Sequence, residues 1–355
     1  EDGSLAAEYV HVESEHSALS CAIGASATGA RTFTATSSQG LLYMAECLTY
    51  AAGGRFPIVM MNANRATALP WNIYGDQRDS LSLLDHGWIQ VYAEDNQEAL
   101  DLALMAYAVA ENPAVATPVM VNLDGFALTH TYETVDVPAP EEADAFLPPY
   151  GGAGNRFDFE HPVNIGFSAG PEYDRYFKYW EHRDMLDAPA VVTQVEQRFA
   201  EVFGRQYPGM IETLDCDDAD VILVTLGSAA GLVRSVVRQL RDQGVRAGML
   251  RPMPSALIAE ALRGAKAVGV LEKDVSFGAE GTVFTNVNSA LQQAAVGVPT
   301  YNFVGGLGGD DISETQVHGM CRMLVQAAEG TGELPRVSFL GIDSPADALG
   351  AERGR

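Results

Sequence analysis

The chain has 355 residues, 47% of them hydrophobic, and carries 47 Asp and Glu against 22 Lys and Arg, which gives a net charge of −25. A chain of this length can bury more than one core, so we expect two α/β domains. The acidic balance argues against nucleic acid or an anionic membrane as the main partner, because phosphate groups bind basic surfaces.

The first part of the sequence alternates helical and strand patterns. We expect helices at 16–29, 41–52 and 95–111, and strands at 31–35, 56–61, 87–93 and 118–123. Asp95 and Glu98 have the spacing of a capping box at the start of the third helix. A long polar loop at 65–82 is more often functional than idle. This order of elements predicts a doubly wound parallel sheet.

The composition changes in the middle of the chain. Prolines and glycines at 135–167 interrupt every period and predict a connector, and 172–205 predicts a helical bridge broken near Pro189, without chemistry. A second α/β unit begins at 219–225. Its further strands are expected at 245–250, 267–271 and 299–304, and its helices at 229–243, 255–263, 285–293 and 313–328. The pattern predicts a smaller second parallel sheet and a division into 1–134, 135–215 and 216–355.

The four cysteines lie far apart, at positions 21, 47, 216 and 321, and form no C-x-x-C pair. Neither a zinc site nor an iron–sulfur cluster is supported within the chain, so we expect no metal site and buried thiols. No apolar run reaches the roughly 18 residues that a membrane span needs, and residues 1–4 lack the basic start of a signal peptide. A cytoplasmic location and no membrane partner are therefore expected.

Two carboxylates, Glu13 and Glu15, stand before the first predicted helix. On an extended segment they would share a face, and the small residues that follow would place one of them between apolar walls, where burial favours a protonated carboxyl. The alternative is an exposed acidic helix start that is stabilised by the helix dipole.

Arg65 directly follows a predicted strand, at the expected mouth of the parallel sheet. Its planar guanidinium could hold a substrate carboxylate through two hydrogen bonds, and the alternative is a structural ion pair with Asp76 or Asp79. The glycine-rich segment 305–309 follows the last strand and invites a phosphate-loop interpretation. It lacks the lysine of a P-loop, so a plain turn is the alternative.

Five segments together resemble one known family: VESEHSA at 12–18, FTATSSQGL at 33–41, NRA at 64–66, NLDGF at 122–126 and FVGGLGG at 303–309. Over almost the whole chain they are similar to the alpha chain of the pyruvate:ferredoxin oxidoreductase family, the thiamine-diphosphate-dependent 2-oxoacid:acceptor oxidoreductases. The resemblance implies an α/β fold with a thiamine diphosphate pyrimidine-binding-like domain and a transketolase C-terminal-like domain, both doubly wound parallel-sheet domains.

The resemblance also implies partners and cofactors. Thiamine diphosphate would be shared with a beta subunit that carries the diphosphate, Mg²⁺ and [4Fe-4S] cluster sites. Subunits of gamma and delta type, ferredoxin or another electron acceptor, and coenzyme A as co-substrate complete the expected system. Family members carry a further strand, a Pro-Ile-Thr-Pro-like turn and a threonine near the substrate ahead of the segment with which this sequence begins.

Matched position by position, Glu15 resembles the glutamate that contacts N1′ of the aminopyrimidine, and Arg65 resembles the arginine beside the substrate carboxylate. A carboxyl group bonded to N1′ favours the tautomer whose exocyclic nitrogen removes the C2 proton of the cofactor. Ser37, Ser38 and Gln39 are expected to shape the turn beside the cofactor.

The hypothesis is therefore a catalytic alpha subunit of a 2-oxoacid:acceptor oxidoreductase that converts a 2-oxoacid oxidatively to acyl-CoA and CO₂. The substrate is pyruvate or, because Trp71 and Tyr74 lie near the expected pocket, an aromatic 2-oxoacid such as phenylglyoxylate. The alternatives are a thiamine-dependent 2-oxoacid dehydrogenase or transketolase-like component, and a non-catalytic structural subunit.

Overall fold

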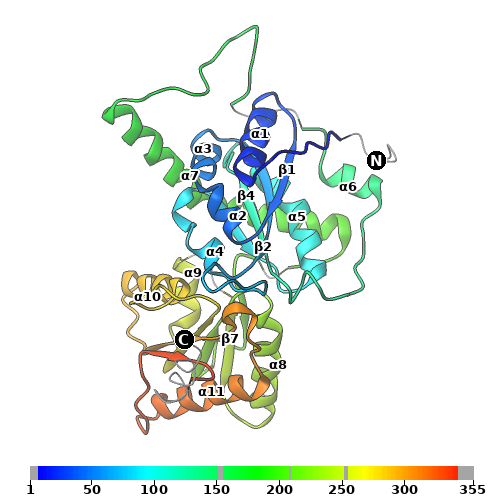
Figure 1. The fold of residues 1–355 in the computed structure, drawn as a ribbon. Helices are drawn as coiled ribbons and strands as arrows, with labels where there is room; N and C mark the ends of the chain where they lie inside the picture. Colours follow the sequence, from blue (N-terminus) through cyan, green and yellow to red (C-terminus); the bar gives the residue numbers. More distant parts are fainter. Residues whose placement is uncertain (1–6, 151–154, 208, 252–254, 343–355) are drawn as a thin grey trace.

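The computed structural model describes residues 7–150, 155–207, 209–251 and 255–342. The chain forms two α/β domains, as predicted, and Figure 1 shows one lying above the other. The first is built on a four-stranded sheet and the second on a six-stranded sheet. None of the helices in the described ranges combines the length and the apolar character that a membrane crossing requires.

All strands of the first sheet are parallel, in the order β1-β2-β4-β3. They are β1 (Thr32–Thr36), β2 (Ile58–Asn64), β3 (Ile89–Tyr92) and β4 (Val119–Asp124). The helices of this domain are α1 (Glu15–Ala27), α2 (Gln39–Tyr43), α3 (Ala45–Gly53), α4 (Arg78–Leu81) and α5 (Asn96–Ala110), with a short 3₁₀ turn η1 (Leu84–His86). Asp95 caps α5 by accepting the N–H of Glu98 at 2.8 Å, which confirms the predicted helix start.

Helices cover both faces of the first sheet. Ile58 and Met60 of β2 and Met120 of β4 pack in the core beneath α1 and α3. Val59 and Val121 belong instead to the core beneath α5. Because successive side chains of a strand point to opposite faces, a continuous apolar run is what a sheet covered on both sides requires.

The second sheet has the order β10-β9-β8-β6-β7-β5, and only β5 pairs antiparallel. The strands are β5 (Glu212–Leu214), β6 (Val221–Val224), β7 (Ala247–Arg251), β8 (Ala267–Glu272), β9 (Thr300–Val304) and β10 (Val337–Phe339). The helices are α8 (Ala229–Asp242), α9 (Ser255–Leu262), α10 (Thr282–Gln293) and α11 (Glu314–Ala328), with a 3₁₀ turn η2 (Leu307–Gly309). The expectation of a smaller second sheet is wrong, because both edge strands are three residues long and lack an apolar run.

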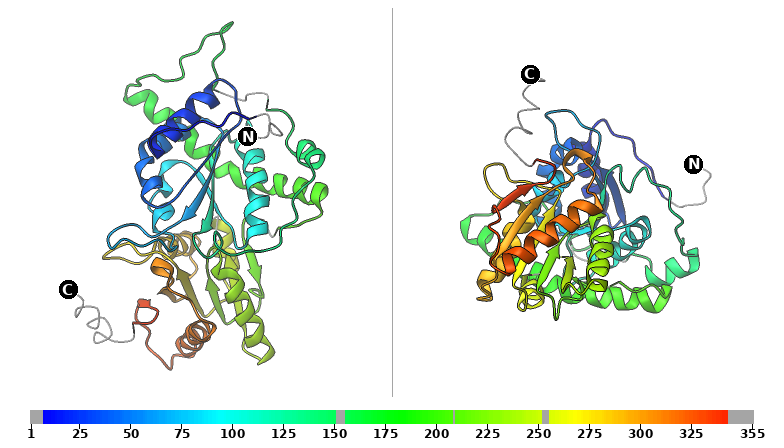
Figure 2. Two further views of the ribbon diagram at one scale, coloured as in Figure 1. Left: turned by 45° about the vertical axis from the view of Figure 1, so that its right-hand side comes forward. Right: turned by 90° about the horizontal axis from the view of Figure 1, so that it is seen from below.

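Two helices lie between the sheets in sequence, α6 (Pro140–Phe146) and α7 (Pro171–Phe203). The predicted break of the bridge near Pro189 is wrong, since α7 continues through it. A proline inside a helix costs about 3 kcal/mol, and the burial of Ala188, Val191 and Val195 around it offsets that cost. The first turns of α7 project from the first domain (Figures 1 and 2). The division at 134/135 and 215/216 stays a prediction.

A cavity of about 430 Å³ lies beside α5 and α7, and Glu196 of α7 lines it together with Glu98. Burial and, to a lesser degree, the charge of Glu98 raise the pKa of Glu196 to about 7. The folded protein therefore binds this proton more tightly than the unfolded chain, whose glutamates titrate near 4.5. This contribution to stability is fully present below about pH 4.5 and is lost as the pH rises through about 7.

We expect Glu196→Gln to raise the free energy of unfolding at pH 8 by about 1 kcal/mol, a value reduced because the side chain is partly exposed. The variant should also lose the decline in stability between pH 5 and 8. Urea titrations at several pH values measure both effects. Glu201→Gln, at an exposed position of the same helix, is the matched control and should keep the wild-type profile. An unchanged profile in Glu196→Gln would contradict the assignment.

The two domains meet through a buried ion pair. Asp124, the last residue of β4, accepts hydrogen bonds from Lys273 Nζ at 2.9 Å and from the main-chain N–H of Ser228 at 2.8 Å. Burial by itself would raise the pKa of Asp124, but the charge of Lys273 and the hydrogen bonds of Ser228 outweigh it and hold the pKa below its usual range. The carboxyl end of β4 is thus fixed to the end of β8 and the start of α8.

Candidate active site

Buried polar side chains gather at the carboxyl edge of the first sheet. Asn62 and Asn64 lie near the end of β2, and Asn122 of β4 is the register partner of Asn62. Asn62 Nδ2 donates to Asn122 Oδ1 at 3.0 Å, and Asn64 Nδ2 donates to Asp79 Oδ1 at 2.8 Å. All four side chains are fully buried. Hydrogen bonds between buried side chains therefore hold the polar groups at this edge of the sheet in place.

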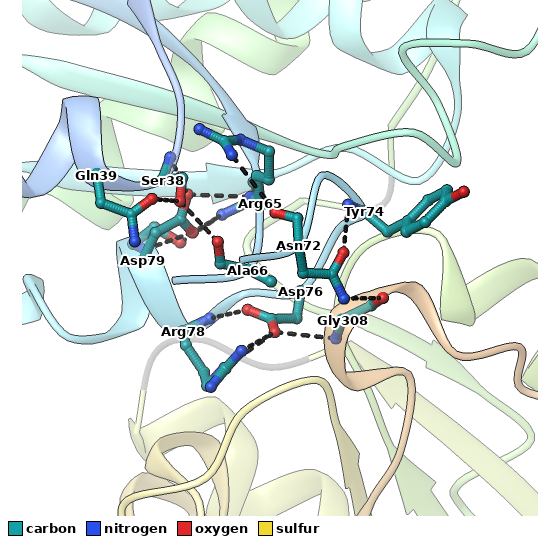
Figure 3. Close-up of polar contacts among 12 residues, drawn as sticks. Ser38, Gln39, Arg65, Ala66, Asn72, Tyr74, Asp76, Arg78, Asp79 and Gly308 are labelled. Atoms are coloured by element: carbon teal, nitrogen blue, oxygen red, sulfur yellow. Dashed lines mark hydrogen bonds and ion pairs between the residues drawn. The ribbon is translucent and has the colours of Figure 1, made fainter. Parts of the chain in front are cut away.

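Asp79 of α4 connects the segments that carry the predicted site residues. Its carboxylate accepts the main-chain N–H groups of Ser38 at 3.0 Å, Arg65 at 3.2 Å and Ser80 at 2.8 Å. Burial raises the pKa of Asp79, and these hydrogen bonds act against that shift. One carboxylate thus sets the position of Ser38 relative to Arg65 (Figure 3).

Arg65 is half-buried at the end of β2, and its guanidinium forms no ion pair with any residue in the described part of the chain. Its Nη1 donates to the main-chain oxygen of Asn72 at 3.4 Å. Asp76 pairs instead with Arg78 at 2.6 Å, and Asp79 contacts only the main-chain N–H of Arg65. The structural alternative, an ion pair of Arg65 with Asp76 or Asp79, is therefore wrong.

The segment 37–39 leads from β1 into α2, of which Gln39 is the first residue. Ser38 is buried with a φ of 51°, a conformation that is unusual for a residue with a side chain. Its hydroxyl lies 2.7 Å from the main-chain oxygen of Ala66 and 2.6 Å from Gln39 Oε1, and the oxygen of Ser37 accepts the N–H of Gly40 at 2.9 Å. These residues shape the turn, and their contact with a cofactor stays a prediction.

Glu13 and Glu15 differ in their surroundings, although both are exposed in this chain. Glu13 accepts a hydrogen bond from Ser17 Oγ at 2.5 Å, which lowers its pKa. Ser14 caps α1, and Glu15 is the first helical residue. The expectation that one carboxylate lies between small apolar walls is wrong within this chain, because Leu19 and Ala22 face the core instead.

Glu15 lies in a notch that a glycine leaves open. A Cβ atom on Gly40 would be 2.9 Å from Glu15 Oε1 and 2.7 Å from Thr36 Oγ1. Thr36 Oγ1 is itself buried and has no hydrogen-bond partner among the described residues. An unpartnered hydroxyl beside an exposed carboxyl suits a ligand ring that both donates and accepts hydrogen bonds. Thr36 lies in the segment 33–41 that carries the family resemblance, but no sequence pattern singled it out as a site residue.

The glycine-rich segment 305–309 contacts the loop that follows Arg65. The main-chain N–H of Gly308 donates to Asp76 Oδ2 at 3.0 Å, and its oxygen accepts from Asn72 Nδ2 at 2.8 Å. Both main-chain polar groups of Gly308 thus have partners in the first domain, which favours the turn over a phosphate loop.

No group of three or more His, Cys, Asp or Glu that could hold a metal ion occurs within the described ranges. Cys47, Cys216 and Cys321 are buried free thiols as expected, whereas Cys21 is exposed.

The comparisons with known proteins cover most of the chain. Residues 1–197 match the family described as pyruvate flavodoxin/ferredoxin oxidoreductase, thiamine diphosphate-binding, and residues 219–317 match the pyruvate:ferredoxin oxidoreductase core domain II. The pyruvate synthase subunit PorA of Methanothermobacter thermautotrophicus is 43% identical, over 90% of this chain and 84% of that protein. The ketoisovalerate oxidoreductase subunit VorA of Pyrococcus abyssi is 43% identical, over 94% of this chain and 85% of that protein.

Among solved structures, the chain resembles the 2-oxoglutarate:ferredoxin oxidoreductase from Magnetococcus marinus with 2-oxoglutarate, coenzyme A and succinyl-CoA bound. The TM-score is 0.63 at 20% identity, and the match covers 89% of this chain and 57% of that one. At this identity the likeness shows a shared fold.

Proposed function

Because the chain belongs to the pyruvate:ferredoxin oxidoreductase family, we propose that it is the alpha subunit of a 2-oxoacid:ferredoxin oxidoreductase that forms an acyl-CoA and CO₂. The observation that carries the proposal is the half-buried Arg65 guanidinium without an ion pair among the described residues, held at the carboxyl edge of the first sheet. A cation with free hydrogen-bond donors at that place suits the carboxylate of a 2-oxoacid.

The polar groups of Glu15 and Thr36 beside Gly40 support a place for thiamine diphosphate, whose aminopyrimidine ring carries both donors and acceptors. Glu15 would hold a proton toward the ring nitrogen N1′, and Thr36 Oγ1 offers the unpartnered hydroxyl beside it. The turn of Ser37, Ser38 and Gln39 would border the ring. When bound, thiamine diphosphate supplies the carbanion chemistry that decarboxylation of a 2-oxoacid needs.

The rest of the cofactor set belongs, in this proposal, to other chains. A beta subunit would hold the diphosphate, Mg²⁺ and a [4Fe-4S] cluster, and ferredoxin would receive the electrons, with coenzyme A as the acyl acceptor. The relatives named as subunits of pyruvate synthase and ketoisovalerate oxidoreductase support such an assembly.

For the substrate we favour an aliphatic 2-oxoacid, pyruvate or its branched-chain relative. Tyr74 packs its ring against Phe126 at 4.5 Å between centroids, and a Cβ on Gly309 would be 2.2 Å from Tyr74 Cβ. Tyr74 is thus held by Phe126 and by Gly309 of the second domain, although it stays 41% exposed, and Trp71 of the same loop is 75% exposed and could face an aromatic substrate. Phenylglyoxylate stays the alternative substrate.

The test is a substrate panel with the intact purified complex, in which reduction of ferredoxin is followed with pyruvate, 2-ketoisovalerate and phenylglyoxylate. We expect coenzyme A-dependent reduction with an aliphatic acid, and the isolated chain should be inactive and colourless. A preference for phenylglyoxylate would contradict the substrate assignment. An iron–sulfur spectrum or turnover in the isolated chain would contradict the subunit assignment.

A further inference from the structure

Asn72 stands between Arg65 and the second domain (Figure 3). Its main-chain oxygen accepts the hydrogen bond from Arg65 Nη1 at 3.4 Å. Its side chain makes two further bonds, since Oδ1 accepts the N–H of Tyr74 at 2.7 Å and Nδ2 donates to the oxygen of Gly308 at 2.8 Å. The conformation of Asn72 is therefore fixed from both sides, once within the loop and once by the second domain.

The glycine-rich segment 305–309, called here the glycine turn, leaves room for the Asn72 side chain at Gly308. Gly308 has a φ of +60°, and a Cβ at this position would lie 2.5 Å from Asn72 Nδ2. A second bond strengthens the same contact, because the N–H of Gly308 donates to the fully buried Asp76, which also pairs with Arg78. Only glycine combines this backbone conformation with so close an approach.

We infer that Asn72 is a positioning residue for substrate binding, through which the glycine turn of the second domain sets the orientation of the Arg65 guanidinium. The inference rests on the proposed function, in which Arg65 holds the substrate carboxylate. The oxygen of Asn72 is the partner that directs the guanidinium, since Arg65 has no ion pair among the described residues. The second domain thereby contributes to substrate binding without supplying a residue that touches the substrate.

Asn72→Asp tests this role with little change in size. The carboxylate still accepts the N–H of Tyr74, but it cannot donate to the oxygen of Gly308 and repels it. With the intact complex we expect KM for the 2-oxoacid to rise about 10-fold, the scale of one lost hydrogen bond with an unpaired group left behind, and kcat to change less than about 2-fold. An unchanged KM overturns the inference.

Two glycine variants separate the contact from backbone strain. Gly308→Ala should raise KM like Asn72→Asp, because its methyl group displaces Asn72 Nδ2. Gly330→Ala is the matched control, with a φ of +69° and no atom within 4 Å of the added Cβ, and its KM should equal that of the wild type. Equal KM values in the two alanine variants overturn the inference.

A double variant distinguishes this inference from the proposed function. If Asn72 acts through Arg65, then Asn72→Asp should change KM by less than about 2-fold in an Arg65→Ala background. A further rise of about 10-fold there would show an independent effect of Asn72 and overturn the inference alone. If Arg65→Ala itself leaves KM unchanged, Arg65 does not bind the substrate carboxylate, and both the proposed role of Arg65 and the inference about Asn72 are wrong.

Discussion

Replacement of Arg65 by alanine is expected to raise KM for the 2-oxoacid about 10- to 100-fold, the range for losing a hydrogen bond to a charged group. Decarboxylation disperses the negative charge of the substrate, so the contact serves capture and orientation more than the transition state. Steady-state kinetics of the intact complex should therefore show a larger change in KM than in kcat. Arg65→Lys should show a smaller rise, because lysine keeps the positive charge although its ammonium group cannot form the planar pair.

The fold should tolerate this change. Asp79 contacts the main-chain N–H of Arg65, a bond that alanine keeps, so the thermal midpoint should stay near that of the wild type. Arg78→Ala is the contrasting control, because it leaves the buried Asp76 unpaired and should cost about 3 kcal/mol of stability. A stable Arg65→Ala complex with unchanged KM would remove Arg65 from the active site.

Glu15→Gln is expected to slow C2 proton exchange of bound thiamine diphosphate by on the order of 10²-fold or more, the usual scale for a lost acid–base group. Exchange is measured by NMR on the quenched complex and requires no substrate. Glutamine keeps the shape of the side chain at Gly40, and Ser14 still caps α1, so folding should be unaffected.

Glu13→Gln is the matched control for this experiment. Glu13 lies two residues away, is also exposed, and is engaged with Ser17 at the helix start. Its replacement should change the exchange rate by less than about 2-fold, because it would lose a local hydrogen bond on the surface. Equal exchange rates in Glu15→Gln and the wild type would contradict the role of Glu15. The proposed role of Arg65 in substrate binding is tested separately, by KM in Arg65→Ala, and would not be affected by that result.

Local patterns predicted the parts of the fold that depend on neighbours in sequence. The apolar runs of β2 and β4 and the cap at Asp95 are examples, since burial and capping act within a few residues. The sequence patterns did not predict the edge strands β5 and β10, because these residues form strands by pairing with a neighbouring strand and have no apolar run of their own. The continuity of α7 through Pro189 likewise depends on packing against another element.

Sequence patterns singled out several residues of the candidate site, but not the contacts that connect them. Arg65 and Glu15 were found from their place after a strand and before a helix, and the family resemblance gave them roles that stay predictions. Asp79 binds the main-chain N–H groups of three segments, and Asn72 contacts Gly308, which lies 236 residues further along the chain. No local sequence pattern relates the segments that these contacts join. The Asp79 contacts lie within the first domain, whereas the contact of Asn72 with Gly308 joins the two domains, and both depend on the tertiary arrangement of the chain.

The ion pair of Asp124 and Lys273 bears on how such a chain can be divided in evolution. Each charge is neutralised by a group from the other half, and Asp124 is almost completely buried. If the gene were cut within the connector, the first fragment would contain Asp124 at the end of β4 without its positive partner. The second fragment would expose Lys273, which is largely buried in the whole chain. Both fragments would lose stability until they bound each other again, so a split gene can persist only where its two products are made together.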